Sequence, residues 1–163
     1  MKNTTATFIG HRECYGINKE EISAYIIGLI ELGITRFLCG GMGAFDWTCA
    51  KIVYKLKKQY PHVQSFLVIP YLTFRVLNRR YFDDIIYPEG FEKYHFKAAI
   101  PARNKYMVEN ASHAICYVNS NCGGAAKTYQ LAIQNNLIIK NFGSYSISQC
   151  SFSVYIYSLY FIF

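Results

Sequence analysis

The stretch "LCGGMGAFDWTCA", residues 38–50, joins an apolar segment to a predicted helix through a turn that is nearly free of side chains. The β-prone run 35–41 precedes the turn, and the helical pattern continues to about Lys58. Glycine at such a place has two interpretations. Either the backbone turns too tightly for a Cβ atom, or another group lies directly against it. A strand that passes straight into a helix is the repeating unit of parallel sheets.

The same alternation continues on both sides of this turn. Asn18 is a good N-cap with Glu21 three residues later, and Gly33 is a natural helix stop. Residues 72–100 are ambiguous and suggest a helix followed by a short strand, whereas Pro101 suits the first turn of a helix. Further strands are expected at 5–10, 63–71, 112–119 and 137–143, and further helices at 19–32 and after 122. This order predicts an α/β layer sandwich with a mostly parallel central sheet covered on both faces.

Composition places the chain among single-domain globular proteins. Its 163 residues can bury one sizeable core, and the net charge of +7 suits an anionic partner or simple solubility. No pair of the six cysteines has C-x-x-C spacing, so neither a disulfide framework nor a zinc site is expected. The polar N-terminus and the lack of an apolar run of about 20 residues predict a cytoplasmic protein without a membrane span.

We expect one domain over residues 1–143 and a separate apolar, aromatic tail over residues 144–163. The tail carries almost no charge, and its pattern leaves three interpretations open. It could be an edge strand, a partner-binding segment or sequence foreign to the domain.

Three stretches should meet at the carboxyl edge of the predicted sheet, where open α/β sheets bind ligands. They are "GHR" (10–12), "GGMGAFD" (40–46) and "NSNCGG" (119–124). Helix N-termini present unpaired N–H groups and favour anions, and glycine lets an anion approach the backbone. His11 and Arg12 could add donors. The arrangement therefore points to a phosphate-containing ligand.

Known phosphate-binding motifs are incomplete here. Gly41-Met42-Gly43 begins like the dinucleotide fingerprint G-x-G-x-x-G, but Asp46 stands at the third glycine. The run 123–128, "GGAAKT", ends like a P-loop in which Asn121 and Ala126 replace both glycines. No metal cluster is expected among the histidines, which are His11, His62, His95 and His113.

Purely structural interpretations stand beside the functional ones. Gly40, Gly41 and Gly43 could only shape the turn, and Gly123 and Gly124 could do the same before the later helix. Asp46 could merely complement the first turn of its helix. Arg103 could be a solvated helix residue.

The motifs "FIGHR", "CGGMGAFDWTCA", "PARNKYMVENASHAICYVN" and "GGAAKTYQLA" follow one another in this order. Over about residues 5–140 the chain thus resembles the YpsA-like branch of the SLOG superfamily, which also holds LOG-type phosphoribohydrolases and the DNA-processing protein A family. The resemblance implies a Rossmann-like fold, a homodimer and a small nucleotide ligand such as ADP-ribose, NAD or a nucleoside monophosphate. The ligand-binding positions it implies are Gly10, His11, Arg12, Gly40, Gly41, Gly43, Asp46, Arg103, Asn104, Gly123, Gly124 and Thr128.

LOG-type enzymes carry a "PGGxGTxxE" loop that reads "CGGAAKTYQ" in this chain, with Gln130 at the glutamate position. A glutamine cannot act as a general acid or base. We therefore expect nucleotide binding or sensing, without a required cofactor or metal, rather than catalysis. Two alternatives remain. One is an N-glycosidase-type nucleotide hydrolase with Asp46 and Arg103 as candidate catalytic residues. The other is a single-stranded DNA binder, which the charge favours although the sequence shows no basic-aromatic stripe.

Overall fold

The computed structural model describes residues 2–144, so all of the predicted tail beyond Ser144 lies outside the described residues. The described chain forms an all-parallel sheet with the strand order β4-β3-β2-β1-β5-β6. The strands are β1 (Thr5–Gly10), β2 (Arg36–Cys39), β3 (Gln64–Val68), β4 (Asp84–Ile86), β5 (His113–Tyr117) and β6 (Ile138–Asn141). The chain adds β2 to β4 on one side of β1 and then β5 and β6 on the other, so the order reverses at β1.

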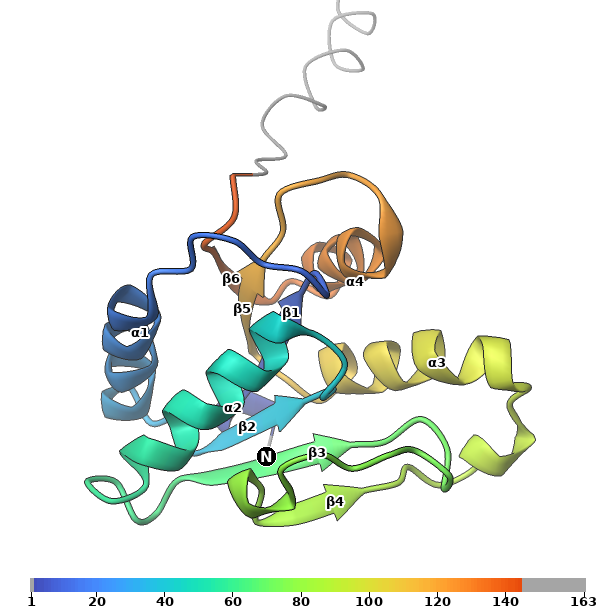
Figure 1. Ribbon diagram of the computed structural model, residues 1–163, viewed down its shortest axis with the longest axis horizontal. Coiled ribbons are helices and arrows are strands. Elements are labelled where there is room, and N and C mark those ends of the chain that lie inside the picture. The colour runs from blue at the N-terminus through green and yellow to red at the C-terminus, as the bar shows by residue number, and fades with distance from the viewer. Residues whose placement is uncertain (1, 145–163) are drawn as a thin grey trace, which may run out of the picture.

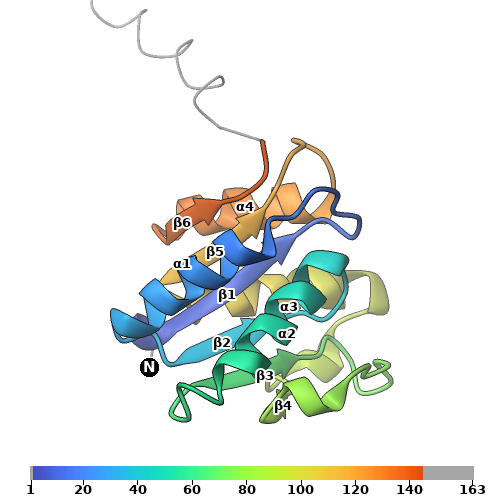
Figure 2. The ribbon, with the colours of Figure 1, turned by 60° about the vertical axis from the view of Figure 1, so that its left-hand side comes forward.

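Two pairs of helices cover the sheet, as Figures 1 and 2 show. The pair α1 (Lys19–Glu31) and α2 (Ala44–Leu56) packs on one face. The pair α3 (Phe96–Glu109) and α4 (Gly123–Gln134) packs on the other face. Three short 3-10 helices complete the elements, namely η1 (Lys2–Thr4), η2 (Arg79–Tyr81) and η3 (Phe91–Lys93). The predicted Rossmann-like α/β sandwich is therefore confirmed.

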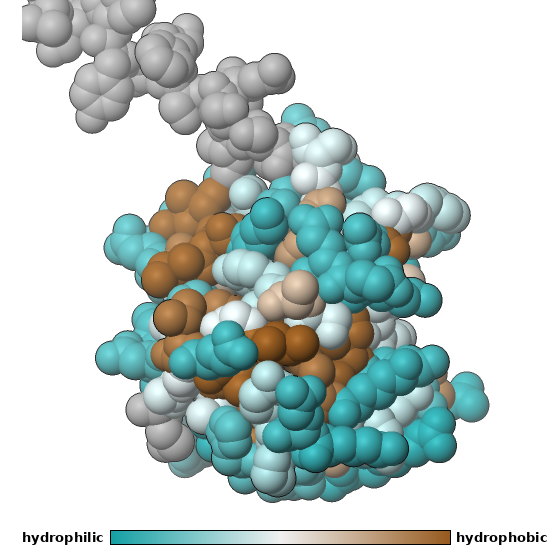
Figure 3. Space-filling view, turned by 90° about the vertical axis from the view of Figure 1, so that its left-hand side faces the viewer, coloured by the Kyte–Doolittle hydropathy of each residue, from teal (hydrophilic) through white to brown (hydrophobic). Residues whose placement is uncertain are grey.

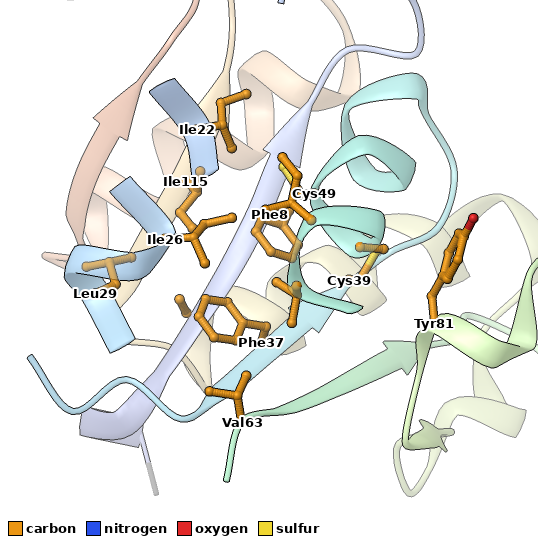
Figure 4. Packing of buried hydrophobic residues seen from close by; sticks show 14 of the residues in the cluster. Phe8, Ile22, Ile26, Leu29, Phe37, Cys39, Cys49, Val63, Tyr81 and Ile115 are labelled. Atoms are coloured by element: carbon orange, nitrogen blue, oxygen red, sulfur yellow. The ribbon is translucent and has the colours of Figure 1, made fainter. Parts of the chain in front are cut away.

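The larger part of the core lies between the sheet and the α1–α2 layer. Phe8 of β1 and Phe37 of β2 stack with ring centroids 6.0 Å apart, and Ile22 and Ile26 of α1 cover them (Figure 4). Ile9 belongs instead to the cluster beneath α4, because successive strand residues point to opposite faces. The sheet is thus buried on both sides, and its carboxyl edge is the part left for a ligand.

Local sequence chemistry sets the limits of α1 as predicted. The Asn18 side chain accepts a hydrogen bond from Glu21 N at 3.1 Å, which satisfies one of the free amides of the first turn. Gly33 follows the C-cap with φ of +95°, a left-handed conformation that glycine adopts without steric cost. Both sequence predictions are confirmed.

Two predictions between β3 and β5 need correction. Pro101 does not begin a helix, because α3 starts five residues earlier at Phe96, where the His95 side chain accepts a hydrogen bond from Lys97 N. Pro101 is tolerated inside α3 because it lies on the exposed side, where water can satisfy the carbonyl group that loses its partner. Within 72–100, the short strand is confirmed as β4, but the helix expected before it is only the 3-10 turn η2.

A polar cluster ties η2 and the residue before β4 to the end of α2 and the start of β3. Lys57 Nζ donates to Asp83 Oδ2 at 2.5 Å and to Ser65 Oγ at 2.7 Å, and Ser65 Oγ donates to Tyr81 O. Burial favours the neutral carboxyl, but the hydrogen bonds from Lys57 and Ser65 outweigh it and lower the pKa of Asp83. Among the described residues, no helix is long and apolar enough to cross a membrane.

Candidate functional site

A cavity of about 340 Å³ opens at the carboxyl edge of the sheet, where the strand order reverses. Four parts of the chain form it: the end of β1, the turn between β2 and α2, one face of α3 and the first turns of α4. The lining includes ten of the twelve predicted site residues, namely Gly10, His11, Arg12, Gly40, Gly43, Asp46, Arg103, Asn104, Gly124 and Thr128. Gly41 and Gly123 lie outside the lining.

The sequence prediction missed the apolar part of this lining. Ile100 and Met107 lie on the same face of α3 as Arg103 and Asn104, because positions 100, 103, 104 and 107 recur at helical spacing. Met107 falls within the helix expected from Pro101, four residues after Arg103, so helical periodicity identifies it. Ile100 precedes Pro101 and is found only when the helix begins at Phe96. Phe8, Ile9, Met42 and Ala125 complete the lining.

Arg103 is a structural centre of the site. Its side chain is buried, at 2% exposure, so the alternative of a solvated helix residue is wrong. Nη1 donates to Gly40 O at 2.5 Å and to Val68 O at 3.0 Å, and Nε donates to Asn104 Oδ1 at 2.9 Å. One guanidinium group thus joins α3 to the carboxyl ends of β2 and β3. Burial lowers the pKa of Arg103, although the negative charge of Asp46 acts in the opposite direction and raises it.

Asp46 stands in the first turn of α2 and is 8% exposed. Its Oδ2 accepts a hydrogen bond from Met42 N at 3.2 Å, which closes the turn before the helix. Burial raises the pKa of Asp46, although Arg103 and the amides of Met42 and Gly41 act in the opposite direction. The carboxyl group therefore stabilises the turn and also faces the cavity.

The glycines of the 38–50 stretch are explained by the protein itself. A Cβ atom on Gly40 would lie 2.8 Å from Arg103 Nη1, and one on Gly43 would lie 2.9 Å from His11 O. Gly41 has φ of +66°, and its Cβ would lie 2.6 Å from Leu67 Cδ1. Each contact is closer than a real Cβ atom tolerates. The bare turn therefore lets Arg103, β3 and the 10–12 loop pack against it.

Gly124 is different from these glycines. A Cβ atom there would meet nothing within 4 Å, so the space above the start of α4 is open. The N-cap residue, Cys122, makes no side-chain capping bond. Thr128 Oγ1 donates to Gly124 O at 2.8 Å and accepts from Asn104 Nδ2 at 3.0 Å, which links this turn to α3. The first turn of α4 is thus positioned by Arg103 through Asn104 but is left uncovered.

The remaining side chains of the site supply polar groups. Arg12 is exposed at the mouth of the cavity. His11 Nε2 is buried and has no hydrogen-bond partner within the part of the chain that the structure describes. Over residues 2–144, no three His, Cys, Asp or Glu side chains gather in a group that could hold a metal ion. An unpartnered buried nitrogen is costly, and a bound water or ligand would satisfy it.

The packing role of Gly41 can be separated from its backbone conformation. Gly16 has nearly the same φ, +67°, but a Cβ atom there would meet nothing within 4 Å, so Gly16→Ala isolates the conformational cost of about 1 kcal/mol. Gly41→Ala adds a clash with the buried Leu67, and we expect it to lower the free energy of unfolding by about 1–3 kcal/mol more. Urea denaturation of both variants measures the difference. Equal losses of unfolding free energy in the two variants would contradict the predicted clash between residue 41 and Leu67.

The raised pKa of Asp46 predicts a pH-dependent stability. A carboxyl group with a raised folded pKa contributes stability that is complete below its unfolded value of about 3.8 and is lost as the pH rises through the folded value. The Asp46→Asn variant has no carboxyl group to ionise, so it does not lose this stability as the pH rises. Its amide oxygen can still accept the hydrogen bond from Met42 N. We therefore expect the variant to gain stability relative to wild type as the pH rises from about 4 to 8. Urea denaturation across this pH range measures the free energy of unfolding of both proteins. A difference between variant and wild type that stays constant or falls with pH would contradict the burial effect.

Comparison with known proteins agrees with this architecture. The chain is 25% identical over 121 residues to the UPF0398 protein BH1768 of Halalkalibacterium halodurans, a match that covers 68% of the chain and 64% of that relative. It also superposes on DNA processing protein A from Streptococcus pneumoniae with a TM-score of 0.63 at 16% identity, covering 90% of this chain and 53% of that one.

A second solved structure, DNA processing protein A from Helicobacter pylori, is described for its single-stranded DNA binding mode. It gives a TM-score of 0.60 at 16% identity and covers 84% of this chain and 64% of that one. The chain therefore spans roughly half to two thirds of the length of these relatives. At such identity, the structural likeness shows a shared fold.

The comparison with family models covers nearly all of the described chain. The YpsA model, described as the YspA SLOG family, matches residues 6–153. That span contains all the residues that line the cavity, from Phe8 to Thr128. The chain therefore belongs to the YpsA family of SLOG proteins.

Proposed function

We propose that the protein binds a nucleotide or nucleotide-derived ligand in the carboxyl-edge cavity, with a phosphate group at the first turn of α4. The observation that carries the proposal is the open space above Gly124, next to a helix start that no side chain caps. The other glycines in the cavity lining, Gly10, Gly40 and Gly43, are covered by protein atoms. Among the lining glycines of the described chain, Gly124 therefore leaves its backbone available to a ligand.

Charge favours α4 over α2 as the phosphate site. Both helices begin at the cavity, and each N-terminus carries a partial positive charge worth about 0.3–1 kcal/mol to an anion. The first turn of α2 already holds the carboxyl group of Asp46, whereas the first turn of α4 holds no acidic residue. Arg12 at the mouth adds a cation that can bind phosphate oxygens. An anion is therefore better placed at α4.

The other polar groups suit the rest of a nucleotide. Asp46 can accept hydrogen bonds from sugar hydroxyl groups, and His11 Nε2 offers a further polar partner inside the lining. Ile100 and Met107 give an apolar wall for a base. The cavity volume of about 340 Å³ lies at the small end of the range for ligand pockets, which favours a nucleoside monophosphate over a complete dinucleotide.

A charge placed at Gly124 should abolish phosphate binding without harming the fold. Gly124→Asp has room for the side chain, and a carboxylate at a helix start is favourable for the helix itself. We expect this variant to bind AMP, ADP-ribose and NAD at least about tenfold more weakly than wild type, because the new charge repels phosphate. Isothermal titration measures the affinities, and thermal melting confirms folding.

The matched control is Gln134→Glu, which makes the same charge change at the exposed far end of α4. It should bind each ligand as wild type does. The proposal fails if wild type gives no heat with any of the three ligands, or if both variants lose affinity equally. Free base released during incubation with AMP would instead indicate hydrolysis, with Asp46 and Arg103 as the candidate residues.

Single-stranded DNA is a second candidate ligand. The specific support is the fold shared with the Helicobacter pylori protein and its described single-stranded DNA binding mode, together with the net charge of +7. This alternative predicts binding of a 20-nucleotide oligo(dT) whose affinity falls steeply as salt rises, because phosphate contacts release counterions. Fluorescence anisotropy from about 50 to 200 mM salt measures it. A flat titration at the lowest salt would rule this candidate out.

A further inference from the structure

A second concave surface lies on the opposite face of the sheet from α3 and α4. It is a groove of about 730 Å³ between α1 and α2, closed at one side by Asn78 and Tyr81 around η2. The two helices run side by side in Figure 2, and the space-filling view from the α1 side shows apolar surface among polar side chains (Figure 3). No residue of this groove lines the carboxyl-edge cavity. It is therefore a separate surface.

The groove combines an apolar strip with a basic rim. Ala24 and Ile27 of α1 and Ile52 and Leu56 of α2 form what we call the apolar strip. Lys19, Lys51 and Lys55 form the lysine rim, and all three are exposed. Glu20 is the acidic residue in the lining. The groove thus carries a net positive charge around a hydrophobic centre.

We propose that this groove binds an acidic amphipathic helix of a partner protein. The lining recurs every four residues on both helices, at 19, 23 and 27 and at 47, 51 and 55. Each helix has 13 residues and is therefore about 20 Å long, which gives room for several turns of a third helix. An apolar helix face would cover the strip, as in helix-in-groove recognition. Its flanking carboxylates would meet the lysine rim.

The rim argues against a second copy of this chain as the occupant. A symmetric dimer places the same patch on both sides of the interface, so lysine rims would face each other. The chain's own residues 145–163 contain no Asp or Glu and cannot complement the rim.

Nucleic acid would match the charge, but the groove offers little free aromatic surface for base stacking. Trp47 packs edge-on against Phe82, and Tyr81 is 8% exposed and packs against Tyr54. The aliphatic strip and the occupied rings therefore favour a protein helix over an oligonucleotide.

The test is an NMR titration of the ¹⁵N-labelled full chain with a synthetic 15-residue peptide. The peptide carries Leu at helical spacing on one face and Glu on the flanks, and a scrambled peptide has the same composition. We expect the ordered peptide to shift amide signals of α1 and α2, and the scrambled peptide to leave them unchanged. AMP should not displace the peptide, because the groove and the cavity share no lining residue. Peptide binding and nucleotide binding can therefore fail independently of each other.

Charge reversal gives the decisive comparison. Lys51→Glu combined with Lys55→Glu should weaken peptide binding about tenfold or more, because carboxylates would face carboxylates. The matched control, Lys93→Glu with Lys97→Glu, makes the same change at exposed positions away from the groove and should bind as wild type does.

Equal weakening by both pairs, or no signal shifts with the ordered peptide, overturns the proposal. Shifts of the α1 and α2 signals with oligo(dT) alone overturn it in favour of nucleic acid. Concentration-dependent shifts of these signals in the free protein overturn it in favour of self-association.

Discussion

The site depends on one buried cation. Arg103 donates from Nη1 to Gly40 O and Val68 O, so a single group holds α3 against the carboxyl ends of two neighbouring strands. A buried guanidinium group is costly without hydrogen bonds, and these two carbonyl oxygens together with Asn104 Oδ1 provide partners for Nη1 and Nε. A Cβ atom on residue 40 would lie 2.8 Å from Arg103 Nη1, so only glycine lets the guanidinium group come this close to the turn. The turn without side chains and the buried arginine therefore depend on each other.

That constraint extends to the ligand side of the cavity. Asn104 accepts from Arg103 Nε and donates to Thr128, whose hydroxyl donates to Gly124 O. The chain of hydrogen bonds fixes the start of α4 relative to the β2–α2 turn, although the two segments are far apart in sequence. Thr128 donates its single hydroxyl hydrogen to Gly124 O, so toward a ligand this hydroxyl could only accept a hydrogen bond. Its role is to position α4. The phosphate donors of the proposed site are then backbone amides rather than the Thr128 hydroxyl.

The sequence predicted the fold more completely than the site. Alternating strands and helices with recognisable caps, such as Asn18 and Gly33, were enough for the parallel sandwich, because these signals are local. The start of α3 is not predictable from Pro101, because a proline in a first helical turn and a proline on an exposed helix face look alike in sequence. Burial of Arg103 was equally invisible, since it depends on carbonyl groups 35 and 63 residues away. The glycine pattern located the turn but could not say whether protein or ligand covers it.

The two surfaces share α2. Asp46 faces the cavity, and the next two residues, Trp47 and Thr48, line the α1–α2 groove. Phe45, Cys49 and Val53 are fully buried, so the helix as a whole is fixed against the sheet. Asp46 also accepts the hydrogen bond from Met42 N that closes the turn before α2. The cavity and the groove therefore meet at the first turn of one helix, which Phe45 anchors in the core.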